Sequence, residues 1–387
     1  MGFYPGISDQ EYEKLKRDAH EYMWGELDPL VGEWDRLGKL PREKLWPEFR
    51  KYGFWGLIIP KEYGGVGLSH EQYVWFEKEW AKLSGGIRVI LHVHNLGAEI
   101  ISELGTEKMK EELLPQIARG EVSVAFALTE RNAGTGRDIK SEAKKEGNKY
   151  ILNGEKHLIT NADFAKYFVV VCRSPNGWSQ LLVPRDTEGF LIKDMPETMG
   201  CRGGYHGILE FHNCEIPEEN ILGVEGRGLD DAIRVLRVSR IYIAANAVGV
   251  CERCLELSLK RAKERVTFGK PIAKRQAIQG YLSEMATLTY CARVAMLDAI
   301  KKVDERGEPG TEADLCKLFA IEAVKRVTDL ALLIHGGLGY TREYPIERLY
   351  RDCRLNWLEE GTPTIHKFEA ARLLLQGKYT GDESYTF

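Results

Sequence analysis

The chain has 387 residues, of which 43% are hydrophobic and 29% are charged, a composition typical of a globular protein with large buried cores. Its formal net charge of -4 gives no overall basic bias toward nucleic acid or anionic lipid. The sequence contains no apolar run long enough for a membrane span, and residues 1–21 carry mixed charges without the apolar centre of a secretory signal.

The first third is predicted to be helical. In residues 71–83, Tyr73, Phe76, Trp80 and Leu83 recur at steps of three and four, which places them on one helix face. Residues 53–67 are rich in Gly and aromatics and indicate a connection. Residues 109–114 predict a short helix that is interrupted or ends near Pro115.

From Val122 the pattern changes to short β-branched runs. Residues 150–152 are followed by Asn153-Gly154, a pair that favours the tight turn of a β-hairpin. Further strands are predicted at residues 122–128, 167–172, 181–183 and 208–211. Together they indicate a small β domain of ordinary size.

After Gly228 the helical pattern returns in long segments. Helices are predicted over residues 229–262, 276–303, 312–334 and 362–375. Long helices of this kind usually pack as a bundle. The predicted fold class is therefore α+β: an N-terminal α-helical domain (1–121), a middle β-barrel-like or sandwich domain (122–226), and a C-terminal four-helix bundle (227–387).

The eight cysteines are mostly scattered, which is typical of a reduced, cytoplasmic protein. Only Cys251 and Cys254 have CxxC spacing, and they lie in a strongly helical run without a second such pair. We therefore expect no metal site.

Several loops could hold a phosphate-bearing ligand. The glycine clusters at 64–67 and 336–339 do not complete a G-x-G-x-x-G motif after a strand, which disfavours a Rossmann site. Residues 126–136 (FALTERNAGTG) and 156–161 (KHLITN) end predicted strands in hydroxyls and free backbone groups, with Thr129 and Thr160 as candidate donors. Ordinary capping of strand ends is the alternative interpretation.

Glu359 and Glu360 lie between an apolar segment and the last predicted helix, which Thr362 could cap. A carboxylate that is partly buried in such a place gains proton affinity and can act as a general base. A solvated acidic pair is the other interpretation of the same residues.

These segments together resemble the acyl-CoA dehydrogenase family over about residues 8 to 376. The motifs that carry the resemblance are 126–136, 156–161, 265–276 (RVTFGKPIAKRQ), 334–340 (IHGGLGY) and 344–362 (YPIERLYRDCRLNWLEEGT). The family's fold is a helical domain, a β domain and a helical bundle, in agreement with the pattern above.

The resemblance implies bound FAD and a homotetramer in which neighbouring subunits complete each flavin site. Residues matching the flavin loops are Phe126, Leu128, Thr129, Gly134, Thr135, Leu158 and Thr160, the last beside flavin N5. Residues matching contacts to a neighbouring subunit's FAD are Arg265, Phe268, Gln276, Gly336 and Gly337, and Leu333 before the Gly-Gly pair is a further expected cofactor-binding residue. Thr362 and Thr364 match positions near the adenosine and pyrophosphate.

Glu360 matches the family's catalytic glutamate. Some branches place the base on the first long helix of the bundle instead, but the matching residue here, Ser239, cannot serve. The resemblance implies α-proton removal by Glu360, hydride transfer from Cβ to flavin N5, and hydrogen bonding of the thioester oxygen by the Glu360 N–H and a ribityl hydroxyl. Electron transfer flavoprotein is the expected electron acceptor. The expected substrate-binding residues are Arg88, Thr135, Arg240, Glu359 and Gly361.

The chain departs from the family at positions near the acyl pocket. Arg131, Thr135-Gly136, Leu158 and Leu333 replace the common Pro, Ser-Asp, Trp and Gln, and Glu359 stands where an aromatic residue is common. Arg88 lies in residues 84–95, which line the distal acyl pocket in the family, and Arg occurs there in the glutaryl-CoA dehydrogenase branch. Since a buried Arg needs an anion, we predict an acyl-CoA with a distal carboxylate, of the glutaryl-CoA or substituted succinyl-CoA type. The alternative is an internal partner for Arg88, such as Glu359.

Other activities remain open at this point. The chain could be a dehydrogenase of an uncharged branched or cyclic acyl-CoA, an acyl-CoA oxidase, or a lyase-type homologue. A non-catalytic flavoprotein that binds nucleic acid or a partner would require a basic C-terminal face, whereas the C-terminal half is mixed in charge.

Overall fold

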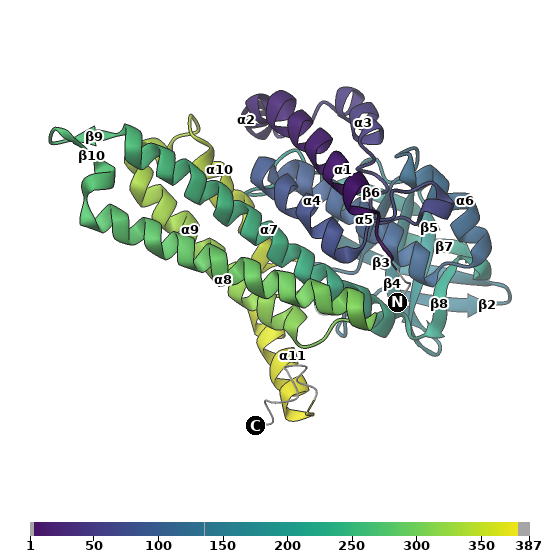
Figure 1. The fold of residues 1–387 in the computed structure, drawn as a ribbon. Helices are drawn as coiled ribbons and strands as arrows, with labels where there is room; N and C mark the ends of the chain where they lie inside the picture. Colours follow the sequence, from purple (N-terminus) through teal and green to yellow (C-terminus); the bar gives the residue numbers. More distant parts are fainter. Residues whose placement is uncertain (1–3, 135, 378–387) are drawn as a thin grey trace.

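The computed structural model describes residues 4–134 and 136–377. Helices form the N-terminal part, a β-sheet forms the middle part, and helices return in the C-terminal part, as the sequence predicts (Figure 1). None of the helices in the described chain combines the length and apolar character that crossing a bilayer requires.

In its described residues, the N-terminal part is built from six α-helices, four of which have a side-chain cap at their start. The side chains of Ser8, Ser69, Ser84 and Thr106 each accept a hydrogen bond from the first turn of the helix that follows. The predicted face of α4 is buried at all four positions. The helices are α1 (Asp9–Tyr22), α2 (Asp28–Leu37), α3 (Arg42–Lys51), α4 (His70–Leu83), α5 (Gly85–Leu104) and α6 (Glu107–Ala118).

The prediction that α6 ends near Pro115 is wrong, because the helix continues to Ala118 with Pro115 inside it. Proline removes the hydrogen bond that would reach the carbonyl of Glu111. Glu111 is exposed to solvent, so water can satisfy that carbonyl.

The middle part is one eight-stranded sheet in the order β6-β7-β3-β2-β4-β5-β8, and β1 pairs in parallel with β4. Phe168 on β4 and Phe190 on β6 have ring centroids 4.9 Å apart, although these strands are not neighbours in the sheet. The sheet therefore curls around a shared core, as expected for a barrel-like domain. The strands are β1 (Val124–Ala127), β2 (Glu142–Glu146), β3 (Lys149–Thr160), β4 (Tyr167–Ser174), β5 (Gly177–Pro184), β6 (Phe190–Asp194), β7 (His206–Pro217) and β8 (Ile221–Gly226).

The predicted hairpin turn at Asn153-Gly154 is wrong. Strand β3 runs through both residues, and the register against β7 shifts between Leu152 and Gly154. The Asn153 side chain instead accepts a hydrogen bond from the backbone N–H of Asn213, at 2.8 Å. Gly154 therefore lies at a β-bulge in a long strand. Glycine is common at bulges as well as in tight turns, so the residue type alone does not distinguish the two.

The C-terminal part contains three long helices, α7 (Gly228–Glu264), α8 (Gln276–Arg306) and α9 (Glu312–His335). In Figure 1, α7 runs from the sheet to a distal hairpin made by β9 (Val266–Thr267) and β10 (Lys270–Pro271). Two shorter helices follow, α10 (Pro345–Asp352) and α11 (Pro363–Leu375). Helix α4 packs so tightly on α7 that a Cβ at Gly249 would lie 2.2 Å from the Lys78 carbonyl oxygen. The N-terminal helices thus share one core with the bundle.

Candidate active site

Glu360 occupies a strained loop between the 3-10 turn Leu355–Trp357 and α11. Its φ is 55°, in the left-handed region that a residue with a Cβ rarely adopts, and Gly361 follows with φ 102°. Such strain persists only where the surroundings hold the backbone, and it is common at functional sites.

Buried cationic side chains hold this loop by three consecutive carbonyl groups. Lys317 Nζ donates to the carbonyl oxygen of Glu359, and also to that of Gly361 at 2.9 Å. Arg240 Nε donates to the Glu360 carbonyl oxygen at 3.3 Å. These contacts explain how the strained conformation is maintained.

Asp314 on α9 organises the cations behind the loop. Its Oδ1 lies 2.7 Å from Arg240 Nη1 and 2.8 Å from His366 Nδ1. Burial opposes a charge on Asp314, but His366 and Arg240 outweigh it and hold the pKa of this carboxyl below its usual range. Burial also lowers the pKa of Lys317 to about 8. We call Arg240, Asp314, Lys317 and His366 the loop clamp.

The Glu360 side chain is 9% exposed, and its Oε1 lies 3.6 Å from Nε2 of His92 on α5. His92 Nε2 also lies 3.3 Å from Ser239 Oγ on α7. Helix α5, helix α7 and the Glu360 loop therefore meet at one point.

Arg88 binds Glu359 inside the chain, as the second interpretation of the sequence supposed. Its Nη1 lies 2.8 Å from Glu359 Oε2, and Asn356 Nδ2 donates to the other carboxylate oxygen at 3.1 Å. Burial opposes the charge on Glu359, but Arg88 holds the pKa of this carboxyl below its usual range. Arg88 thus has an anionic partner without any ligand.

The first predicted flavin loop leaves the end of β1 and is fixed by a buried ion pair. Lys156 Nζ is completely buried and donates to the Leu128 carbonyl oxygen at 2.9 Å and to Glu130 at 3.1 Å. Glu130 also accepts hydrogen bonds from the backbone N–H groups of Lys140 and Ser141. Glu130 and Lys156 therefore set the path of the described residues 128–134 and 136–141. Gly134 is exposed on this loop, and Thr135 lies outside the described residues.

The second predicted flavin segment lies directly beside the first. The His157 N–H donates to the Thr129 carbonyl oxygen at 2.8 Å. Leu158 sits in a register shift of β3 with φ 61°, which leaves its side chain 48% exposed. Thr160 Oγ1 lies 2.9 Å from His206 Nδ1. Apolar side chains next to hydroxyls at the ends of β1 and β3 suit the face and edge of a flat heterocycle, so these residues fit an isoalloxazine ring.

Arg265 and Phe268 flank β9, and the β9–β10 hairpin lies at the end of the bundle away from the sheet (Figure 1). Arg265 follows Ser239 by 26 positions along α7, which places them about 39 Å apart at 1.5 Å per residue. Phe268 is 96% exposed at the hairpin tip, and Leu333 is 60% exposed. Gln276 begins α8 and is exposed, as is Gly337, whereas the Arg265 guanidinium lies against Gly336. One chain therefore cannot bring these residues to its own β-sheet loops.

The remaining predicted positions lie near the loop clamp. Thr362 is the residue before α11, but its side chain makes no capping hydrogen bond to the described helix. Thr362 and Thr364 are exposed, while Gly361 is held by its carbonyl as described above.

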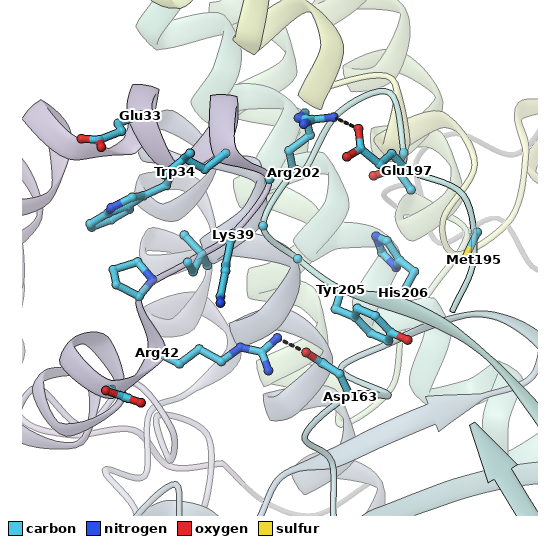
Figure 2. Close-up of a pocket in the computed structure, with 18 of the residues that line it drawn as sticks. Glu33, Trp34, Lys39, Arg42, Asp163, Met195, Glu197, Arg202, Tyr205 and His206 are labelled. Carbon is cyan, nitrogen blue, oxygen red and sulfur yellow. Dashed lines mark hydrogen bonds and ion pairs between the residues drawn. The ribbon is translucent and has the colours of Figure 1, made fainter. Parts of the chain in front are cut away.

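A pocket of about 1050 Å³ opens between the α2–α3 connection and residues 195–206. Figure 2 shows two ion pairs in it, Arg42 with Asp163 and Arg202 with Glu197, and shows Tyr205 and His206 on the wall that faces Lys39. Its lining carries both signs of charge and does not include Glu360. Two contacts link the pocket to the second predicted flavin segment: His206 Nδ1 lies 2.9 Å from Thr160 Oγ1, and the Tyr205 carbonyl oxygen accepts from the Asn161 N–H at 3.0 Å.

The described residues contain no cluster of His, Cys, Asp or Glu side chains that could hold a metal ion. Cys251 and Cys254 are buried free cysteines in the core between the helices. These findings leave the flavin segments and the Glu360 loop as the candidate site.

Comparison with known proteins agrees with this geometry. Models of the acyl-CoA dehydrogenase N-terminal, middle and C-terminal domains match residues 9–121, 125–214 and 226–375. Acryloyl-CoA reductase (NADH) of Anaerotignum propionicum is 38% identical over 376 residues, 95% of each chain. The chain belongs to the acyl-CoA dehydrogenase family. It is an oxidoreductase that acts on CH–CH donors, and its cofactor is FAD.

Relatives within the family differ in substrate. A subunit of the caffeyl-CoA reductase–Etf complex of Acetobacterium woodii is 32% identical and covers 95% of this chain and 99% of its own. The structure of butyryl-CoA dehydrogenase from Megasphaera elsdenii has a TM-score of 0.90 at 33% identity, covering 97% and 100%. A glutaryl-CoA dehydrogenase bound to glutaryl-CoA has a TM-score of 0.91 at 30% identity, covering 97% of each chain. The glutaryl-CoA branch is therefore not favoured over the butyryl-CoA and acryloyl-CoA branches.

Sequence reasoning named Arg240 only as a substrate-binding residue, and it missed the other members of the loop clamp and the partners of His92. Asp314 and Lys317 are polar residues on the buried stripe of α9, in step with Ile321 and Val324. Charged residues at core positions of a helix are a usable signal, because burial of a charge requires a partner. That signal identifies the residues but not the backbone carbonyls that they bind.

Proposed function

We propose that Glu360 is the general base that removes the α-proton of an acyl-CoA thioester. The observation that carries this proposal is the Glu360 loop itself, in which a nearly buried carboxylate is presented on a strained backbone held at three consecutive carbonyls. A base on so rigid a support loses little by reorganisation when it meets the α-carbon. When bound, FAD accepts the hydride that leaves Cβ.

The surrounding residues would orient the thioester. The backbone N–H of Glu360 would donate to the thioester oxygen and stabilise the enolate-like charge that develops there. The loop clamp keeps that N–H and the Glu360 carboxylate in a fixed relation to each other. Phe126, Leu128, Thr129, Gly134, Thr135, Leu158 and Thr160 would hold the isoalloxazine ring on the other side of the substrate.

We infer that the acyl group is uncharged. The distal-carboxylate substrate that Arg88 suggested would have to displace Glu359, which already satisfies the guanidinium at 2.8 Å. Displacing a buried carboxylate from its cation is costly, because it leaves a desolvated anion without a partner. A short unbranched, branched or cyclic acyl chain avoids this competition.

A glutaryl-type substrate remains the second candidate, since Arg88 is a buried cation within reach of the loop that carries Glu360. Turnover of butyryl-, cyclohexanecarboxyl-, glutaryl- and benzylsuccinyl-CoA separates the two. Equal or faster turnover of the uncharged pair supports our inference, and a clear preference for the carboxylated pair contradicts it.

Electron transfer flavoprotein is proposed as the electron acceptor, since an Etf-linked complex is among the relatives. Stopped-flow reoxidation distinguishes this from an oxidase: slow reoxidation by air with fast reoxidation by the flavoprotein is expected. A homotetramer is proposed because Arg265, Phe268, Gln276, Gly336 and Gly337 would then reach a neighbour's FAD. Leu333, Thr362 and Thr364 are the further proposed FAD contacts, the two threonines near the adenosine and pyrophosphate. Sedimentation of wild type and Phe268→Ala, with FAD content, tests this arrangement.

The decisive variant for the base is Glu360→Gln. It should bind FAD and appear yellow, yet lose flavin bleaching by an acyl-CoA by at least about 100-fold, the lower end of a general base's contribution. Glu343→Gln, an exposed acidic residue near α10, is the matched control and should bleach as wild type does. Normal bleaching by Glu360→Gln would end the proposal.

A further inference from the structure

His92 is buried between two carboxylates that come from different parts of the chain. Its Nδ1 lies 3.0 Å from Glu77 Oε1 on α4, and its Nε2 lies 3.6 Å from Glu360 Oε1. The His92 side chain is 2% exposed. Neither ring nitrogen therefore depends on bulk water for a partner.

The hydrogen bonds around Glu77 fix one proton of the ring. Glu77 Oε1 also accepts the hydroxyl proton of Tyr73, at 2.6 Å. An ionised carboxylate has only acceptor positions, so Nδ1 must carry a proton and donate it. The second ring nitrogen, Nε2, is then the atom whose protonation can change.

Nε2 lies near Ser239 Oγ as well as Glu360, but only the Glu360 carboxylate can exchange a proton with it, and this leaves two ways to place one proton. Either Nε2 carries it and Glu360 is a carboxylate, or Glu360 carries it and Nε2 accepts. The total charge is the same in both states. The 3.6 Å separation is slightly longer than a hydrogen bond, so a small rotation of the Glu360 side chain makes or breaks the contact.

We infer that His92 is a positioning residue that shares one proton with Glu360, and that Glu77 orients its ring for this purpose. The inference rests on the proposed role of Glu360 as the base. In the transfer, the Nε2–H bond breaks and an Oε1–H bond forms, and the electron pair stays on Nε2. No oxidant or further reactant is required.

This arrangement serves both directions of the reaction. During oxidation, the imidazolium favours the ionised form of Glu360, which can then accept the α-proton. During reduction of a 2,3-unsaturated thioester, Glu360 delivers its proton to the α-carbon and His92 supplies the next one. The buried Glu360 carboxylate can therefore exchange a proton with His92 without access to bulk water.

The charges around His92 agree with a protonated ring. Burial alone lowers the pKa of an imidazole, but Glu77 and Glu360, with a smaller effect of Glu359, raise the pKa of His92 to about 10. Helix α4 presents Glu77 and Tyr73, and α7 presents Ser239 and Tyr242, whose ring centroid lies 6.4 Å from that of His92.

Two groups on α5 itself complete the surroundings of His92. Arg88 is neutralised by Glu359. Burial and then Glu103 raise the pKa of Glu99 well above its usual range, which favours the neutral form of this carboxyl. The anionic partners of the ring are therefore the carboxylates of Glu77 and of the Glu360 loop.

The test uses the FAD-loaded enzyme with butyryl-CoA under anaerobic conditions. The pH dependence of flavin bleaching is measured for wild type, His92→Gln, Glu77→Gln and the exposed control His212→Gln. An adjacent opposite charge shifts the ionisation of a carboxyl group by about 1–3 pH units. The pH of half-maximal bleaching should therefore rise by at least about one unit in His92→Gln, rise by less in Glu77→Gln, and stay unchanged in His212→Gln.

A second readout does not depend on flavin reduction. Deuterium incorporation at Cα of butyryl-CoA in heavy water should show the same displacement of its pH profile. Unchanged profiles in His92→Gln overturn the inference. If His92→Gln does not fold, Glu77→Gln, which keeps the ring, decides in the same way. If Glu360→Gln loses all bleaching but the pH profiles of His92→Gln and Glu77→Gln are unshifted, this inference alone is overturned. If Glu360→Gln bleaches normally, the proposed role of Glu360 as the base is overturned as well.

Discussion

Arg88 and Glu359 form a buried ion pair that joins α5 to the Glu360 loop, with Nη1 and Oε2 at 2.8 Å and side chains 2% and 14% exposed. Arg88 Nη2 also lies 3.7 Å from Cys201 Sγ, in the segment that leads to His206, and His206 contacts Thr160 on β3. The pair therefore connects helix α5, the Glu360 loop and the segment that leads to β7.

Removal of one member of this pair should destabilise the protein. Arg88→Met leaves the Glu359 carboxylate buried without its cation, and such losses are typically about 3–5 kcal/mol. Urea unfolding at fixed FAD concentration measures the change. The double variant Arg88→Met, Glu359→Leu should recover part of the loss, because neither charge remains; a double variant as unstable as the sum of the single changes would contradict the internal pairing.

The sequence was sufficient for the order of the parts and for most helices, because their apolar spacing is regular over many residues. It failed at Asn153-Gly154, where a turn-forming pair lies inside β3. Local preference favours a turn there, but pairing of β3 with β2 and β7 on its two sides keeps the strand extended. The bulge at Leu158 was equally hidden, since its positive φ depends on the neighbouring strand.

Within the site, the family motifs contain Thr160 and Glu360 but not the residues that hold Glu360 in place. Lys317 contacts carbonyls 42 and 44 positions away, and His92 contacts Glu360 from another domain. A backbone carbonyl has no signature in a sequence, so its partner cannot be assigned before the fold is known. The internal partner of Arg88 was foreseen only as one of two alternatives.

Loss of Lys317 should damage catalysis more than cofactor binding. Lys317→Met removes the donor to the Glu359 and Gly361 carbonyls, so the strained Glu360 conformation loses its support. A displacement of about 1 Å at a catalytic group can cost about 100-fold in rate. Single-turnover bleaching should fall by about that factor while FAD content stays near wild type. Lys301→Met, on the exposed face of α8, is the control; a normal bleaching rate in Lys317→Met would show that the loop clamp is dispensable.

Glu130 should control retention of FAD. Its carboxylate ties Lys140, Ser141 and Lys156 to the loop that starts at the end of β1. Burial opposes its charge, but the hydrogen bonds from Ser141 and Lys140 hold the pKa of Glu130 below its usual range. Glu130→Gln leaves the buried Lys156 ammonium without an anion, so the loop should loosen and FAD dissociate faster. Flavin fluorescence after dilution measures this, with the exposed Glu142→Gln as control; equal dissociation rates would contradict the role assigned to Glu130.

The protonation of His92 should also be visible in the pH dependence of stability. The pKa of His92 is raised from 6.5 to about 10 in the folded chain. Between these values the native state binds more protons than the unfolded state, so the stabilisation is complete below pH 6.5 and is lost as pH rises through 10. The pKa of Lys317 is lowered from 10.5 to about 8 in the folded chain, so this residue contributes the opposite slope only above pH 8.

The informative window for His92 is therefore pH 6.5 to 8. There the free energy of unfolding of wild type should fall relative to that of His92→Gln by about 1.4 kcal/mol per pH unit, the linkage of one proton. Urea titrations at several pH values with constant FAD measure this difference, and parallel pH profiles for the two proteins would show that the ring is neutral in the folded chain.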